Sequence, residues 1–281
     1  LDTIAAWAAG KGFKAVQMPI FNSAIFDIDR AATSDAYCDE VNGVLASHGL
    51  VISELSTHRA GHVLCAHPIY GEIIDVFVPA QARGNPKARM DWAVDQLMKA
   101  ARATKRLGLT RHVTMSGGLA WPFLYAYPPR PDGLIEEAFA ELARRWRPIL
   151  DAFDAVGASV GYELHPGEDV HDGPSFERFL AATGNHDRVA ILYDPSHLFL
   201  QHIDYAGFID IYHQRINSFH VKDAEWNASP RTGVYAGFVS WTERAGRFRS
   251  PGDGDIDFGA VFSKLTEYNF SGWASLEWEC C

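Results

Sequence analysis

The sequence predicts an α/β fold of the (β/α)8 barrel class, in which parallel strands alternate with helices. Strand-like and helical patterns alternate along all 281 residues, which is typical of β-α-β units. Neither a linker nor a block of like charges divides the chain, so a single domain over residues 1–281 is expected. Polar residues follow the later strands, at the ends where such barrels carry their chemistry. An open doubly wound sheet is the alternative.

The first half of the chain alternates between long helical patterns and short strands. The predicted helices span 1–10, 34–48, 87–107 and 134–156, and the predicted strands span 14–18, 50–55 and 112–115. Ser34 can cap the second helix, and Gly49 closes it. Gly108 ends the third helix, and Pro148 inside the fourth predicts a kink.

The second half is more regular. The predicted strands span 159–164, 189–193, 216–221 and 274–278, and the predicted helices span 175–182, 205–213 and 258–268. Because the chain opens on a helix without an initiator Met and stops on a strand, the first strand and last helix of the barrel are expected to be absent from it. Residues 223–258 are rich in Gly, Ser, Arg and Trp and predict a lid-like loop at the barrel mouth.

Composition and charge exclude several classes of protein. There are 35 acidic and 25 basic residues, and the formal charge of -10 opposes a nucleic-acid-binding surface. Neither a long apolar run nor a signal-peptide pattern is present, so we expect a cytoplasmic protein with no membrane partner. Cys38 and Cys65 are isolated and Cys280 and Cys281 are adjacent, which predicts reduced thiols rather than a disulfide framework or a thiolate zinc site.

Side chains with metal-ligand chemistry end the four later strands. They are Glu163 and His165, Asp194 and His197, His220 with Lys222 and Asp223, and Glu277 with Glu279. Alternate residues of a strand share a direction, so one member of each pair is expected to reach a shared centre. Three carboxylates and one imidazole placed together repel unless a cation compensates them. Several oxygen ligands with one nitrogen favour Mn²⁺, followed by Mg²⁺ or Co²⁺.

Each of these residues also has an interpretation that involves no metal. Glu163 could pair with a nearby basic residue, and Asp194 could cap the turn before Pro195. His220 could be a satisfied core histidine, and Glu277 could be exposed near the end of the chain. Four such coincidences at four successive strand ends are improbable together, which favours the metal site.

At these segments the sequence resembles the xylose isomerase-like sugar phosphate isomerase/epimerase family, a group of TIM barrels. The matching segments are YELHPG with Glu163, YDPSH with Asp194 and His197, FHVKD with His220, SLEWE with Glu277, and SPGDGDIDF before the last helix. The resemblance implies that Glu163, Asp194, His220 and Glu277 hold one divalent cation. It also implies that the two glutamates move protons and that His197 binds substrate oxygens.

The implied activity is that of a metal-dependent sugar isomerase or epimerase with a metal-stabilised enediolate and paired Glu acid/base residues. Return of the proton to the same carbon with inversion is epimerisation, and return to the adjacent carbon is isomerisation. The alternative is a lyase or dehydratase on a 3-keto-glycoside or a keto-inositol, in which the same enolate expels a leaving group. Both activities use the same four ligands, so the sequence does not separate them.

Several further residues are candidates for contact with substrate. His58 follows a predicted strand, and His165 follows Glu163 by two residues. Trp121 could stack on a sugar face or fill the core. Lys222 could orient a substrate oxygen or pair with the neighbouring Asp223. Arg249 could hold an anionic or hydroxylated substrate, or it could be a solvated loop residue.

Other functions fit the sequence less well. An apurinic endonuclease, found in a related barrel family, needs more histidine ligands and a basic groove, which the charge of -10 opposes. A non-catalytic binding barrel is a further alternative. Neither a phosphate-binding loop nor a dinucleotide glycine fingerprint occurs. The expected partner is therefore a small sugar or keto-sugar, with no nucleic acid, and the chain is expected to form a homo-oligomer.

Overall fold

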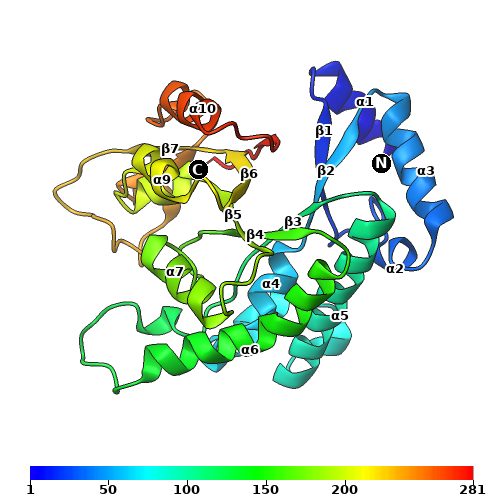
Figure 1. Cartoon of the computed structure of the whole chain (residues 1–281). Coiled ribbons are helices and arrows are strands. Elements are labelled where there is room, and N and C mark those ends of the chain that lie inside the picture. The colour runs from blue at the N-terminus through cyan, green and yellow to red at the C-terminus, as the bar shows by residue number, and fades with distance from the viewer. Residues whose placement is uncertain (281) are drawn as a thin grey trace. The chain divides into compact units, whose positions relative to one another are not determined.

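The computed structural model describes residues 1–280, and Cys281, together with the prediction made for its thiol, lies outside the described residues. The chain forms two compact units, Leu1–Ala190 and Ile191–Cys281. Both units contain parallel strands that alternate with helices (Figure 1). The described cysteines Cys38, Cys65 and Cys280 are free thiols. Across residues 1–280, the structure contains no helix that is both long and apolar enough to span a bilayer.

The first unit is built around four parallel strands that neighbour one another in chain order. They are β1 (Ala15–Pro19), β2 (Val51–Ser56), β3 (Arg111–Thr114) and β4 (Ser159–Glu163). The helices are α1 (Asp2–Gly10), α2 (Ile28–Ala31), α3 (Asp35–Ser47), α4 (His58–Leu64), α5 (Pro86–Arg106), α6 (Leu134–Asp154) and α7 (Gly173–Ala182). Three 3-10 segments are η1 (Pro68–Phe77), η2 (Ala80–Ala82) and η3 (Trp121–Phe123). The long helices α5 and α6 run side by side (Figure 1).

Tyr162 of β4 is the centre of an aromatic cluster that joins the sheet to α6 and α7. Its ring meets the Trp146 ring edge-on at 4.9 Å between centroids and the Phe179 ring at 5.0 Å. All three side chains are fully buried. The Trp146 indole also donates a hydrogen bond of 2.8 Å to the Ser116 carbonyl oxygen in the loop after β3. This cluster fixes the position of β4, whose last residue is Glu163.

Replacing Trp146 by Ala is expected to lower the free energy of unfolding by about 3–5 kcal/mol, because it leaves a large cavity among buried rings. Urea denaturation measures the change. The matched control is Arg144→Ala on the same helix. The Arg144 side chain is 73% exposed, so the loss of its pair with Glu141 should change the free energy of unfolding by less than about 1 kcal/mol. Equal losses of unfolding free energy in Trp146→Ala and Arg144→Ala would contradict the central role of this cluster.

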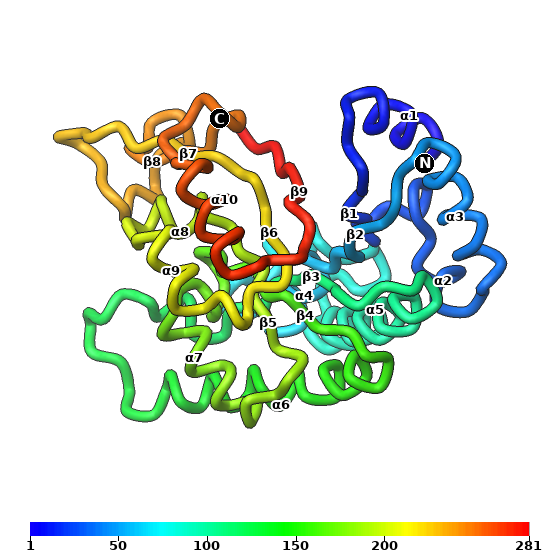
Figure 2. The backbone as a smooth tube through the Cα atoms, turned by 45° about the horizontal axis from the view of Figure 1, so that its top comes forward, coloured from blue at the N-terminus to red at the C-terminus, as the bar shows by residue number. Residues whose placement is uncertain are grey.

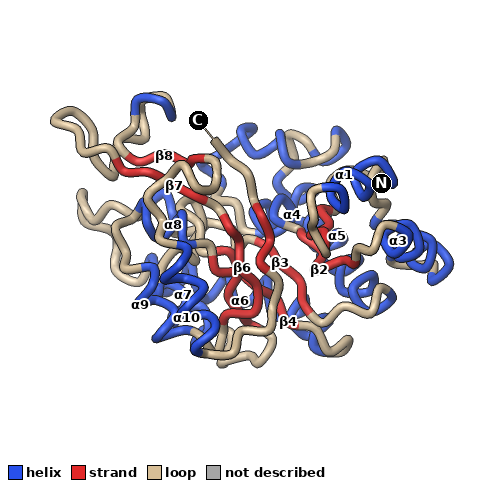
Figure 3. Tube along the Cα trace, turned by 90° about the horizontal axis from the view of Figure 1, so that it is seen from above, coloured by secondary structure: helices blue, strands red, loops and turns tan. Residues whose placement is uncertain are grey.

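The second unit contains three parallel strands and an antiparallel hairpin. β5 (Val189–Tyr193) begins at the end of the first unit and pairs with β6 (Ile216–Val221), which pairs with β9 (Ala274–Leu276). β6 and β9 lie side by side in Figure 2. The helices are α8 (Pro195–Leu200), α9 (Tyr205–Tyr212) and α10 (Phe258–Glu267), with a 3-10 turn η4 at Trp241–Glu243. Figure 3 shows the hairpin of β7 (Asp223–Trp226) and β8 (Gly246–Arg249).

The segment predicted as a lid-like loop, residues 223–258, therefore contains regular structure. Its hairpin pairs Glu225 opposite Arg247, and the Arg247 guanidinium lies 2.6 Å from the Glu225 carboxylate. The two strands have only four residues each and contain no β-branched residue, so no local pattern predicts them. The role of this segment as a lid stays a prediction.

Candidate metal centre and active site

Three side chains that could bind a metal ion converge at the carboxyl ends of the strands of the second unit. Asp194 follows β5 directly, His220 lies near the end of β6, and Glu277 follows β9 directly. One ligand atom from each lies within 4.8 Å of those of the other two. His220 Nδ1 is 2.8 Å from Glu277 Oε2. Asp194 and His220 are buried, whereas the Glu277 side chain is 38% exposed, so the cluster has one face toward solvent.

A buried lysine and a buried histidine flank these carboxylates. Lys222 Nζ lies 2.8 Å from Glu279 Oε2, 3.7 Å from Glu277 Oε2 and 3.9 Å from Asp194 Oδ2. His197 Nε2 lies 3.4 Å from both Asp194 Oδ2 and Lys222 Nζ. The positive charge of Lys222 offsets part of the negative charge, and a cation would offset more.

Asp223 and Arg249 take part in other interactions. The Asp223 carboxylate accepts hydrogen bonds from the backbone amides of Gly252 and Gly254 at 2.8 and 3.0 Å, so it anchors the loop after β8 rather than a ligand set. The Arg249 guanidinium lies 3.4 Å from the Glu225 carboxylate within the hairpin. Arg249 is thus an ion-paired strand residue rather than a solvated loop arginine.

In the first unit, a histidine contacts the carboxylate that ends β4. Glu163 is buried, and its Oε2 lies 3.0 Å from His58 Nε2 at the start of α4. The other ring nitrogen of His58 is hydrogen-bonded to Ser56 Oγ at 2.5 Å. His58 therefore orients the Glu163 carboxylate, and its contact with substrate stays a prediction. His165 Nδ1 lies 2.6 Å from the Pro166 carbonyl oxygen, in the loop after β4.

Trp121 begins the short η3 turn in the loop after β3. It is half-buried and meets the His171 ring edge-on, with 5.1 Å between the ring centroids. Tyr125, a few residues further on, is 64% exposed and so does not fill a core. The loops after β3 and β4 thus place Trp121 beside His171 in the first unit.

A buried acidic pair that was not predicted from the sequence, Glu168 and Asp169, joins these loops. Glu168 accepts one hydrogen bond from the Gly117 amide and is paired with His62 of α4. Asp169 accepts backbone hydrogen bonds from the segment after β3, and burial raises the pKa of Asp169 to about 6 even though those amides oppose the rise. Burial alone would also raise the pKa of Glu168, but the His62 imidazole outweighs it and holds that pKa below its ordinary value. Two consecutive acidic residues in a loop usually indicate a solvated turn, so their burial was not visible in the sequence.

The His62–Glu168 pair predicts a pH-dependent contribution to stability. Burial would lower the pKa of His62, but the Glu168 carboxylate raises it above its ordinary value. The stability that His62 gains from this pair is therefore fully present below about pH 6.5. It is lost as pH rises through the raised pKa of His62. At much lower pH the stabilisation by the pair is also lost, because the Glu168 carboxylate is protonated as pH falls through its lowered pKa.

We therefore expect His62→Gln to lower the free energy of unfolding by about 1–3 kcal/mol between about pH 5 and 6.5, and by less at pH 9. Urea denaturation at several pH values measures this difference. His48→Gln is the control, because the His48 imidazole pairs with the exposed Asp2 carboxylate and its loss should cost less. If the loss in free energy of unfolding caused by His62→Gln were larger at pH 9 than at pH 6, the prediction would be wrong.

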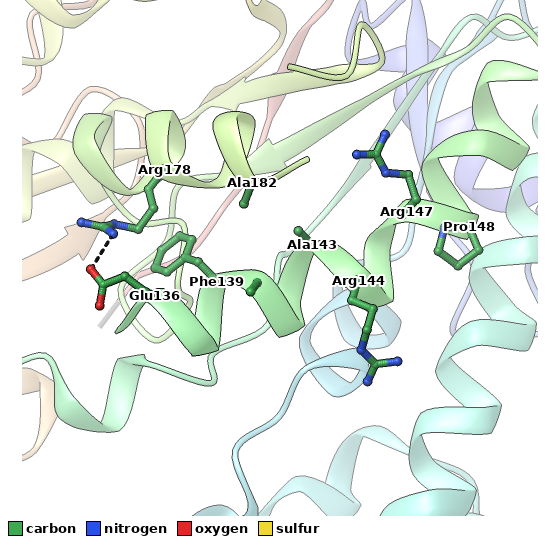
Figure 4. Close-up of a pocket in the computed structure, with 9 residues that line it drawn as sticks. Glu136, Phe139, Ala143, Arg144, Arg147, Pro148, Arg178 and Ala182 are labelled. Carbon is green, nitrogen blue, oxygen red and sulfur yellow. Dashed lines mark hydrogen bonds and ion pairs between the residues drawn. The ribbon is translucent and has the colours of Figure 1, made fainter. Parts of the chain in front are cut away.

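A separate groove lies on the outer helices of the first unit (Figure 4). It has a volume of about 560 Å³ and lies between α6 and α7. The Arg178 guanidinium and the Glu136 carboxylate form a pair at 3.1 Å across it, and Phe139 and Pro148 supply apolar surface. Its lining comes from helices and not from strand ends, so it is not part of the candidate site.

Parallel strands that alternate with helices and carry acidic and histidine side chains at their carboxyl ends define an α/β barrel of the enzyme type. The chain belongs to the xylose isomerase-like TIM barrel family, whose sequence profile matches residues 5–280. The predicted barrel class and the predicted family resemblance are both confirmed.

Comparison with individual proteins gives more distant matches. The inosose dehydratase of Lacticaseibacillus casei is 28% identical over 145 residues, which are 51% of this chain and 48% of that protein. The chain thus spans about half the length of the curated relatives that it matches.

Two solved structures resemble nearly the whole chain. The probable 3-DHS dehydratase from Bacillus anthracis has a TM-score of 0.66 and 15% identity, and the match covers 98% of this chain and 86% of that one. The 3-keto-D-glucoside 4-epimerase from E. coli has a TM-score of 0.64 and 14% identity, with 99% and 86% covered. At these identities the likeness concerns the fold.

Proposed function

We propose that the protein is a divalent-metal-dependent enzyme that removes a proton next to the carbonyl of a keto-sugar and returns it, as an isomerase or epimerase does. The observation that carries the proposal is the convergence of Asp194, His220 and Glu277 ligand atoms within 4.8 Å. Glu163 ends β4, the strand that precedes β5 in the chain, and we assign it as the fourth ligand. Membership of the xylose isomerase-like family supports this assignment.

The side chains fit a hard divalent cation. Three carboxylates and one imidazole supply mostly oxygen ligands, a set that suits Mn²⁺, Mg²⁺ or Co²⁺, and we propose Mn²⁺ first. In the second unit, Asp194 and Glu277 bring two negative charges toward His220, with Lys222 as the nearby positive side chain. When bound, the cation supplies Lewis acidity that makes the C–H beside a carbonyl more acidic and stabilises the resulting enediolate.

The residues of the chain perform the proton transfers. We assign Glu163 and Glu277 as the carboxylates that take the proton and return it. The contact of His58 with Glu163, at 3.0 Å, holds that carboxylate in one orientation. We assign His197 and Lys222 to substrate oxygens, because both lie beside the carboxylate cluster.

We also propose that His165, Trp121 and Arg249 contact the substrate. His165 and Trp121 lie in the loops after β4 and β3, where a substrate wall is expected. Arg249 lies in the hairpin of residues 223–258, which we propose as a lid over a single barrel domain. We further propose that the protein acts in the cytoplasm on a small molecule and as a homo-oligomer.

A dehydratase or other carbon–oxygen lyase is the second candidate, acting on a 3-keto-glycoside or a keto-inositol. The curated relatives that are named inosose dehydratases favour it. The chemistry differs only in the fate of the enediolate, which here expels a group β to the acidified carbon. Lys222 and His197, 3.4 Å apart, are suited to protonate a departing hydroxyl.

The test is incubation of the Mn²⁺-loaded protein with a panel of keto-sugars and keto-inositols in D₂O, followed by NMR. Deuterium incorporation with retention of all oxygens supports the isomerase or epimerase. Deuterium incorporation with loss of water or an aglycone supports the lyase. A metal-loaded protein that exchanges no C–H proton in any member of the panel would contradict both.

A further inference from the structure

Asp169 holds the segment after β3 through hydrogen bonds of both its carboxylate and its backbone amide. Its two carboxylate oxygens accept from the consecutive backbone amides of Leu119, Ala120 and Trp121, each at 2.8 Å. Its own amide donates to the Gly117 carbonyl oxygen at 2.8 Å. The side chain is buried, so water does not compete for these bonds. Three successive amides aimed at one carboxylate fix both the path and the direction of this segment.

Glu168 adds a second attachment from the same loop. One of its oxygens accepts from the Gly117 amide and the other is paired with the His62 imidazole on α4. The acidic pair therefore joins the elements that follow β2, β3 and β4 in the first unit. None of the roles assigned to the proposed active site uses this pair.

The backbone in this region leaves little room for other arrangements. Gly117 has a φ of +88°, and a Cβ there would lie 2.4 Å from Cys65 Cβ. A Cβ on Gly118 would lie 2.6 Å from the Gly167 carbonyl oxygen. The loops after β3 and β4 thus approach each other at backbone contact, and the acidic pair sits at that contact.

We infer that Glu168 and Asp169 are positioning residues that hold Trp121, together with His171, as a fixed wall for the substrate. Trp121 is the last residue whose amide Asp169 binds, and the same loop that supplies Asp169 supplies His171. His171 Nδ1 is itself 3.0 Å from the Asp169 carbonyl oxygen, which fixes its ring against Trp121. This inference rests on the proposed function for the identity of the substrate and on the structure alone for the loop.

The first experiment measures the loop without reference to activity. Amide hydrogen exchange is compared in wild type, Asp169→Ala, Asp169→Asn and the control Asp204→Ala, which removes the carboxylate that caps α9 through the Gly207 amide. We expect exchange of amides 119–121 to be at least about ten-fold faster in Asp169→Ala, less so in Asp169→Asn, and unchanged in Asp204→Ala. Equal exchange at these amides in all four proteins would overturn the inference, whatever the reaction is.

The second experiment uses whichever keto-substrate the NMR panel identifies. Asp169→Ala is expected to raise KM by about ten-fold or more while kcat and Mn²⁺ affinity change by less than about three-fold, with partial rescue in Asp169→Asn. The double variant Asp169→Ala/Trp121→Ala should raise KM no further than Trp121→Ala alone. Both substitutions act on the same wall of the substrate site, so their effects should not add.

Two results would contradict the positioning role while leaving the proposed function intact. In one, the fold-increase in KM of the double variant equals the product of the fold-increases in Asp169→Ala and Trp121→Ala. In the other, Asp169→Ala lowers kcat and Mn²⁺ affinity together, which would place Asp169 with the metal site. If Asp169→Ala does not fold, the same comparisons are made with Asp169→Asn. The exchange experiment needs no substrate, so it decides by itself whether Asp169 holds residues 119–121.

Discussion

Replacing Glu277 by Gln is expected to reduce the rate of solvent deuterium incorporation into the substrate by about 10²–10⁴-fold. The amide keeps the size of the side chain but cannot accept the substrate proton. It is also a weaker ligand than a carboxylate, so the affinity for Mn²⁺ should fall as well. NMR in D₂O at saturating Mn²⁺ separates the two effects, because the loss of proton transfer persists when the metal site is filled.

Glu279→Gln is the matched control for this change. Glu279 lies two residues further along and its carboxylate is 2.8 Å from Lys222 Nζ, so both variants remove one negative charge beside the same lysine. We expect Glu279→Gln to retain exchange within about ten-fold of wild type, since it carries no proton in the proposed reaction. Equal losses in the two variants would mean that local charge and not proton transfer explains the effect of Glu277→Gln.

Removal of divalent cations by a chelator is expected to abolish exchange, and added Mn²⁺ is expected to restore it. In the proposed reaction the cation supplies the Lewis acidity that stabilises the enediolate, so its removal takes away the main stabilisation of the charge that forms. Asp194→Asn should weaken Mn²⁺ binding by about 10–100-fold or more, as measured by calorimetry, because it removes one charged ligand.

Asp223→Asn is the control for the metal prediction, because the Asp223 carboxylate binds the Gly252 and Gly254 amides and not the ligand cluster. It should bind Mn²⁺ as wild type does. Full activity in the chelated protein, or the same Mn²⁺ affinity in Asp194→Asn as in Asp223→Asn, would contradict the metal assignment.

The strands were predictable because their apolar runs are strong local signals. The prediction of 189–193 matches β5 and the prediction of 216–221 matches β6, since both segments are apolar and contain β-branched residues. The short helices α4 and α8 were not predicted. Each has fewer than two full turns after its strand, which is too short for a helical period to show.

The grouping of Asp194, His220 and Glu277 could be predicted, because parallel strands bring their carboxyl ends together and these residues lie at strand ends of one unit. Their role as metal ligands stays a prediction. The histidine partners of two other carboxylates could not be predicted. His58 contacts Glu163, and His62 contacts Glu168 although 106 positions separate that pair in the sequence. Such contacts depend on how loops fold back on one another, which no spacing in the sequence records.

The location of a bound Mn²⁺ ion in a crystal, from its anomalous scattering, tests the central claim most directly. We expect one strong peak, surrounded by oxygens of Glu163, Asp194 and Glu277 and a ring nitrogen of His220 at about 2.0–2.6 Å. A peak elsewhere in the protein, or a peak at Asp194 and His220 with the Glu163 carboxylate outside coordination distance, would contradict it.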